Sequence, residues 1–93
     1  MKDALELGHG VTLQFTSWGE HERAGYLQEH DRPDGGGRCG SGGLFDLPGI
    51  REHFPERAVW TVESFDPLSL SPSMLCRACG NHGFVRGGRW VPA

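Results

Sequence analysis

The feature that most constrains the fold of this chain is a run of metal-ligand residue types near its end, CRACGNH at 76–82. Cys76, Cys79 and His82 are spaced three and three, and a Cys-x-x-Cys-Gly turn can point two thiolates at one centre. This pattern predicts a zinc knuckle. Two alternatives are a redox dithiol, which requires a strand and a helix around the cysteines, and cysteines that pack as small hydrophobes.

The small size of the chain makes a metal ligand set important for stability. A chain of 93 residues with 37% hydrophobic content forms a single domain, 1–93, near the size at which a core alone stabilises only marginally. The N-terminus lacks the layout of a secretion signal, and three cysteines are an odd number, so we expect thiols or metal ligands rather than a disulfide framework. We therefore predict a structural zinc as part of the fold.

The fourth zinc ligand has to come from elsewhere in the chain. Structural zinc is usually bound by four Cys or His side chains, and Cys39 is the obvious addition to Cys76, Cys79 and His82. His30 is the substitute for the fourth position. We expect the other histidines to lie at the surface.

Strand patterns dominate the rest of the sequence. Residues 11–16 alternate apolar and polar side chains, and we expect a further strand at 25–30 after a turn. Residues 58–65 are rich in β-branched and aromatic side chains and predict a central strand. Gly87-Gly88 predicts a tight hairpin across 84–91.

The remaining segments predict a loop and at most one short helix. The glycine-rich stretch 32–43 is expected to be a flexible loop that carries Cys39. After it, Asp46 and Pro48 are candidates for the N-cap and first turn of a helix of one or two turns. The predicted fold is a mostly β, zinc-stapled domain with a C-terminal knuckle and β-hairpin.

Charge is unevenly distributed along the chain. Residues 67–93 contain three arginines and no acid, which gives +3 and leaves −6 for residues 1–66. The overall acidity argues against broad nucleic-acid binding, because such binding depends on phosphate neutralisation. The basic end remains a candidate surface for a protein partner or a nucleic acid, with these residues: Arg77, Arg86, Arg89 and Trp90. We expect Trp60 and Trp90 mainly as core anchors, with stacking as the alternative role of Trp90.

Other functional classes find less support in the sequence. No apolar run approaches the roughly 20 residues of a membrane span. The histidine and glutamate spacings of zinc peptidases and zinc deaminases are missing, so we expect no enzymatic activity. A metal-dependent hydrolase with an open zinc near His30 and Glu29 is an alternative.

The segment WTVESFDPLSLSPSMLCRACGNHGFVRGGRWVPA at 60–93 resembles a group of short uncharacterised proteins of actinobacterial phages. FTSWGEHERAGYLQEHD at 15–31 is similar to the same group, so the resemblance covers most of the chain. Leu-Ser-Pro-Ser at 70–73, Cys79 with His82, and Gly83-Phe84 also resemble a wider bacterial family of unknown function. That family usually has a denser cysteine motif where this chain has only Cys39.

The resemblance implies a small zinc-ribbon-like protein with no established catalytic activity, whose metal ligands are Cys39, Cys76, Cys79 and His82. We accordingly expect a phage-encoded protein-interaction module that binds a host or phage protein in the host cytoplasm, with virion association as a further alternative. A zinc-ribbon nucleic-acid binder is the first alternative function, and the hydrolase is the second.

Overall fold

The computed structural model describes residues 4–93 and is mostly β, with one short helix in that part of the chain. This confirms the predicted fold class. The elements are β1 Leu5–Gly8, β2 Val11–Trp18, β3 His21–Asp31, β4 Arg38–Phe45, α1 Ile50–His53, β5 Val59–Phe65, β6 Leu68–Ser71, β7 Met74–Leu75, β8 His82–Arg86 and β9 Arg89–Pro92.

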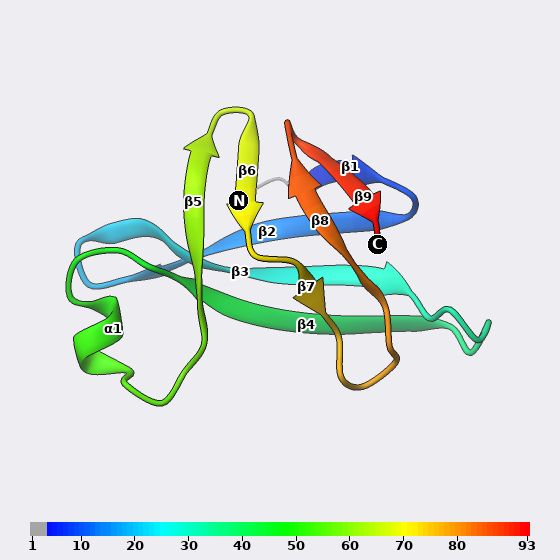
Figure 1. Cartoon of the computed structure of the whole chain (residues 1–93), viewed down its shortest axis with the longest axis horizontal. Helices are drawn as coiled ribbons and strands as arrows, with labels where there is room; N and C mark the ends of the chain where they lie inside the picture. Colours follow the sequence, from blue (N-terminus) through cyan, green and yellow to red (C-terminus); the bar gives the residue numbers. More distant parts are fainter. Residues whose placement is uncertain (1–3) are drawn as a thin grey trace.

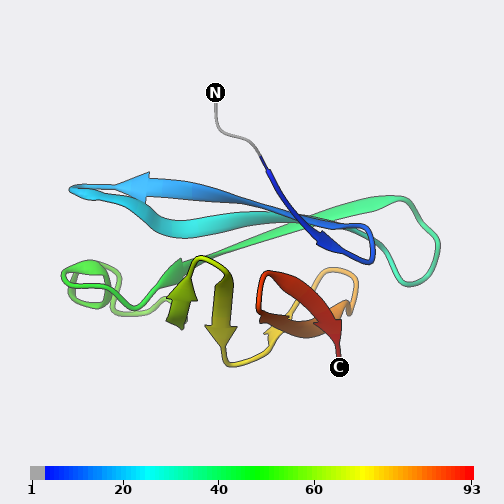
Figure 2. The same ribbon diagram turned by 90° about the horizontal axis from the view of Figure 1, so that it is seen from above.

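The strands form two sheets (Figure 1). The larger sheet has six strands in chain order, β1 to β6, and the smaller one has three, β7-β8-β9. All neighbours are antiparallel except β4 and β5, which pair in parallel over a short stretch that includes Phe45 and Trp60. Figure 2 shows that β5 to β9 lie over one face of the layer formed by β1 to β4. The core lies between these two layers.

The strand predicted from the alternation of apolar residues at 11–16 contributes side chains to the core. Val11 and Leu13 on β2 are 2% and 0% exposed, as expected for a strand with one face against a second layer. The strand predicted at 25–30 also exists and begins earlier, at His21. The main buried cluster consists of Leu7, Val11, Leu13, Tyr26, Phe45, Leu68, Leu70, Met74, Val85 and Trp90.

The predicted loop at 32–43 is wrong in its second half. Residues 38–45 form β4, which pairs with β3 from Asp31↔Arg38 to Gly25↔Leu44. Close packing explains the glycine at 43, because a Cβ at Gly43 would lie 2.6 Å from the Trp60 ring and 2.7 Å from the Tyr26 ring. Glycine is therefore present where two large rings approach the strand backbone. Only residues 32–37 form the loop, which connects β3 to β4.

The predicted short helix exists as one turn, but its start differs from the prediction. The residue that precedes α1 is Gly49, with φ 88°, and no side chain caps the helix. Asp46 is not the N-cap; its carboxylate accepts a 2.8 Å hydrogen bond from Arg51. The ion pair holds the loop before α1 against the helix itself.

The C-terminal hairpin is confirmed. Gly87 and Gly88 have φ 58° and 78°, which is the left-handed conformation that a two-residue turn between β8 and β9 requires. The turn is anchored to β6, since Gly88 N–H donates to Leu68 O and Gly87 N–H donates to Ser69 Oγ, both at 2.8 Å. These bonds attach the small sheet to the large one.

Candidate metal centre

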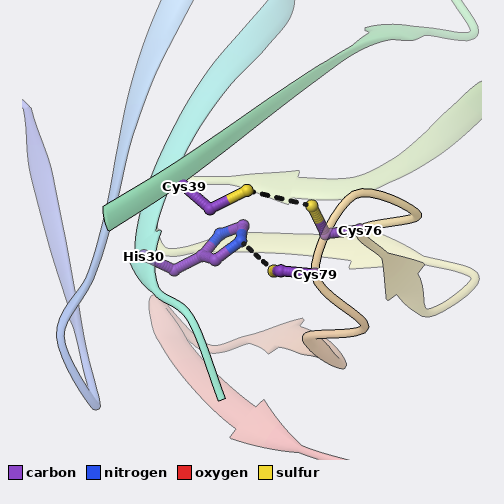
Figure 3. A group of neighbouring side chains, drawn as sticks. All are labelled: His30, Cys39, Cys76 and Cys79. Atoms are coloured by element: carbon purple, nitrogen blue, oxygen red, sulfur yellow. Dashed lines mark hydrogen bonds between the residues drawn. The ribbon is translucent and has the colours of Figure 1, made fainter. Parts of the chain in front are cut away.

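Four side chains from three separate segments converge at one point between the sheets (Figure 3). They are His30, Cys39, Cys76 and Cys79, and one ligand atom from each lies within 4.8 Å of all the others. His30 is fully buried and Cys76 is 5% exposed, while Cys39 and Cys79 are partly exposed. These four residues could hold a metal ion.

Pairing between β3 and β4 positions half of the cluster. His30 and Cys39 are direct cross-strand partners, so their side chains project from the same face of the large sheet. The period of two along β3 puts His30 on the same face as Gln28 and Tyr26, which are also buried. This face is the one covered by the second layer.

A tight turn after β7 supplies the other half of the cluster. Cys76 N–H donates to Asn81 O at 2.8 Å, and Gly80 N–H donates to Cys76 O at 2.7 Å. Gly80 has φ 84°, a conformation that glycine adopts without strain. The turn brings Cys76 and Cys79 to the same centre, as expected for a Cys-x-x-Cys-Gly knuckle.

The distances suit a shared ion better than a bond between the cysteines. Cys39 Sγ and Cys76 Sγ are 3.7 Å apart, whereas two thiolates on a tetrahedral zinc lie about 3.8 Å apart for Zn–S bonds of about 2.3 Å. His30 Nε2 lies 3.2 Å from Cys79 Sγ. All three cysteines are free thiols. The four donors therefore surround a volume the size of one metal ion.

Gln28 determines which nitrogen of His30 faces the cysteines. The Gln28 side-chain oxygen lies 2.8 Å from His30 Nδ1, and because that oxygen can only accept, Nδ1 must carry the proton. Nε2 then has a free lone pair directed at the cluster. Gln28 is itself buried, and its amide nitrogen donates to the Met74 sulfur at 3.9 Å. The imidazole is thus held in the tautomer that a metal requires.

The thiols differ in their electrostatic surroundings. Burial raises the pKa of Cys76, but hydrogen bonds to its sulfur from the backbone N–H groups of Ala78 and Cys79 and from the Cys79 and Cys39 thiols together outweigh burial, so the net shift is downward. Burial, followed by the nearby Cys76 thiol, raises the pKa of Cys39. Burial lowers the pKa of His30, which favours the neutral ring. A thiolate at Cys76 and a neutral imidazole are the forms that bind metal.

The structure brings Cys39, Cys76 and Cys79 together but leaves His82 outside the group, contrary to the spacing argument. His82 lies on β8 with an exposed side chain, and its Nε2 is 2.9 Å from Ser73 Oγ. A strand directs alternate side chains to opposite faces, and β8 directs His82 away from the cysteines. His30, predicted as the substitute, takes the fourth position. The signal for it in the sequence is the alternation Tyr26, Gln28, His30 along β3.

The predicted surface residues divide into two groups. Trp90 is 4% exposed and belongs to the core, which confirms the core prediction and excludes it as an exposed stacking residue. Arg77, Arg86 and Arg89 are exposed. Trp60 also packs against the core, and its indole N–H donates to Ser73 O at 3.2 Å.

Fold and site together define a small two-layer β domain with a Cys₃His cluster between a sheet and a knuckle. Comparison with family models, curated proteins and solved structures gives no match to this chain. Within residues 4–93, no helix has both the length and the apolar character needed to cross a membrane.

Proposed function

We propose that this protein is a small β domain stabilised by one structural zinc ion, bound by His30, Cys39, Cys76 and Cys79. The observation that carries the proposal is the convergence of three sulfurs and one imidazole nitrogen within 4.8 Å. Thiolate and imidazole donors in a four-ligand set are typical of structural zinc sites.

The chemistry of the cluster supports a structural role more than a catalytic one. Four protein ligands complete a tetrahedral zinc, so none of its positions remains for a water nucleophile. The hydrolase alternative also needs a base near His30, but Glu29 is exposed and alternates to the opposite face of β3, where it lies 3.8 Å from Arg38. We therefore propose that the protein is not an enzyme.

Beyond zinc binding, we propose a biological role on the basis of the sequence. A rigid zinc-stapled domain without a catalytic centre is suited to act as a protein-interaction module, and this is the function we favour. Nucleic-acid binding by the basic hairpin is less supported, because Trp90 is buried and offers no stacking surface. A phage origin, and with it a location in the host cytoplasm, stays a prediction.

Zinc content of matched histidine variants tests the proposal. Purified protein should contain about one zinc ion per chain by elemental analysis, and His30→Ala and Cys39→Ser should reduce this content strongly. His82→Ala is the control and should retain zinc, because His82 lies outside the cluster. Wild type without stoichiometric zinc would overturn the proposal. Zinc lost from His82→Ala but kept in His30→Ala would overturn the ligand set.

A further inference from the structure

The outward face of the three-stranded sheet gathers residues that the zinc site does not use. Register places their side chains on one side: Leu75 is opposite His82, Phe84 opposite Val91, and Arg86 opposite Arg89. The inward positions of the same strands are buried, including Met74, Val85 and Trp90. We call the outward set the hairpin face, and it consists of Leu75, His82, Phe84, Arg86, Arg89 and Val91.

The hairpin face exposes apolar side chains. Leu75 is 53% exposed and Val91 is 38% exposed, and in residues 4–93 the other exposed large hydrophobics are Leu5 and Leu27. Phe84 lies between them and is partly exposed. A cluster of exposed apolar side chains with a charged border is typical of an interaction surface.

The charges of the hairpin face are of one sign. Arg86 and Arg89 are direct cross-strand partners, an arrangement of like charges that destabilises a hairpin. Among the described residues neither arginine forms an ion pair, and the sequence from 67 to 93 contains no acid. The Arg86 guanidinium lies over the Phe84 ring, 4.3 Å from its centroid. The two positive charges thus have no compensation within this sheet.

We propose that the hairpin face binds an acidic protein segment that also carries apolar side chains. The acidic groups would pair with Arg86 and Arg89, and the apolar groups would cover Leu75, Phe84 and Val91. The inference rests on the proposed zinc site, because β7 ends at Leu75, next to the ligand Cys76. The metal would therefore fix one edge of the surface.

A nucleic acid fits the same face less well. Stacking with bases needs free aromatic surfaces, yet Trp90 is buried and one face of Phe84 is covered by Arg86. The aliphatic side chains Leu75 and Val91 match apolar protein groups.

Selection from a library of random peptides, roughly 12 residues long, on the zinc-loaded protein tests the proposal. The enriched peptides should have a net negative charge and at least one large apolar side chain. A synthetic copy of the most enriched peptide, titrated by calorimetry, should bind about tenfold more weakly to Leu75→Ser and to Arg89→Glu. Raising the salt concentration should weaken wild-type binding.

Two variants serve as matched controls. Leu27→Ser removes a leucine of nearly equal exposure, 55%, from the other sheet, and Arg57→Glu makes the same charge reversal away from the hairpin face. Both should keep wild-type affinity within about twofold. Equal losses in the controls, enrichment of peptides without excess acid, or no enrichment would each overturn the proposal.

The zinc content of every variant is measured first. Zinc-free wild type would overturn the proposed function, whereas zinc-loaded wild type that enriches no acidic peptide would overturn only the docking inference. Binding of single-stranded oligo(dT), lost in Arg89→Glu without any acidic peptide consensus, would assign the hairpin face to nucleic acid instead.

Discussion

At the scale of single residues, Gln28 controls how His30 presents its ring to the cysteines. A neutral histidine carries its proton on either nitrogen, and the acceptor oxygen of Gln28 at 2.8 Å selects Nδ1. Because Gln28 is buried and also contacts Met74, its amide has little freedom to turn away. Gln28 is therefore a positioning residue for the proposed zinc ligand.

Gln28→Leu should weaken zinc binding about 10- to 100-fold, because the variant keeps the bulk of the side chain but loses the acceptor for Nδ1–H. Gln28→Glu keeps an acceptor at the same place and should retain most of the affinity. Competition with a chromophoric chelator measures the affinity, and the visible spectrum of the cobalt-substituted protein reports the ligand geometry. Equal affinities in Gln28→Leu and wild type would show that Gln28 has no positioning role.

At the scale of elements, β4 shows how a glycine-rich segment can be a strand. Gly43 lies beneath the rings of Trp60 and Tyr26, which pack edge to face with centroids 5.6 Å apart. A strand at this place carries Cys39 in register with His30. The glycines therefore serve the site indirectly, since they let the second layer approach closely enough for the knuckle to reach β4.

Gly43→Ala should destabilise the fold by about 1–3 kcal/mol, because the added methyl group overlaps the buried Tyr26 ring and the partly buried Trp60 ring. Gly40→Ala on the same strand is the control; there the nearest atom to a new Cβ is Gln28 O, at 3.3 Å. This variant should change the free energy of unfolding by less than about 1 kcal/mol. Denaturant unfolding of the zinc-loaded proteins gives both values. Equal destabilisation of the two variants would contradict the packing explanation.

At the scale of the whole molecule, hydrogen bonds, buried side chains and the cysteine cluster hold the C-terminal sheet to the rest of the chain. The turn of the hairpin is hydrogen-bonded to β6, Val85 and Trp90 reach into the core, and the knuckle meets β3 and β4 at the cysteine cluster. The main hydrophobic cluster consists of ten buried residues, a small core for 93 residues. A metal ion at the cluster would tie both layers together.

Removal of zinc by a strong chelator should therefore unfold the C-terminal sheet or the whole domain. Zinc binding in small domains contributes on the order of 10 kcal/mol, comparable to the entire stability of a chain of this size. Tryptophan fluorescence should shift to longer wavelength as Trp90 becomes exposed, and added zinc should reverse the change. Unchanged fluorescence and melting temperature in metal-free protein would show that the ion is not part of the fold.

Local patterns in the sequence account for several of the strands and for half of the site. Alternation at 11–16, β-branched residues at 58–65 and Gly87-Gly88 predicted β2, β5 and the hairpin, because side-chain period and turn conformation are local properties. The Cys76–Cys79 turn is also local, since its hydrogen bonds close within six residues. These strands and turns could therefore be predicted without knowledge of the tertiary contacts.

Tertiary structure decided which distant residues complete the site. Spacing alone favoured His82, but the pairing of β8 with β7 and β9 turns this side chain outward, while the register of β3 with β4 places His30 beside Cys39. Strand 38–45 likewise follows from contacts with Tyr26 and Trp60 rather than from its glycine content. The sequence by itself determined the residue types of the candidate metal ligands, cysteine and histidine, and the turn that holds Cys76 and Cys79. The fourth member of the cluster depended on strand register, because a shift of one residue would turn His30 to the opposite face.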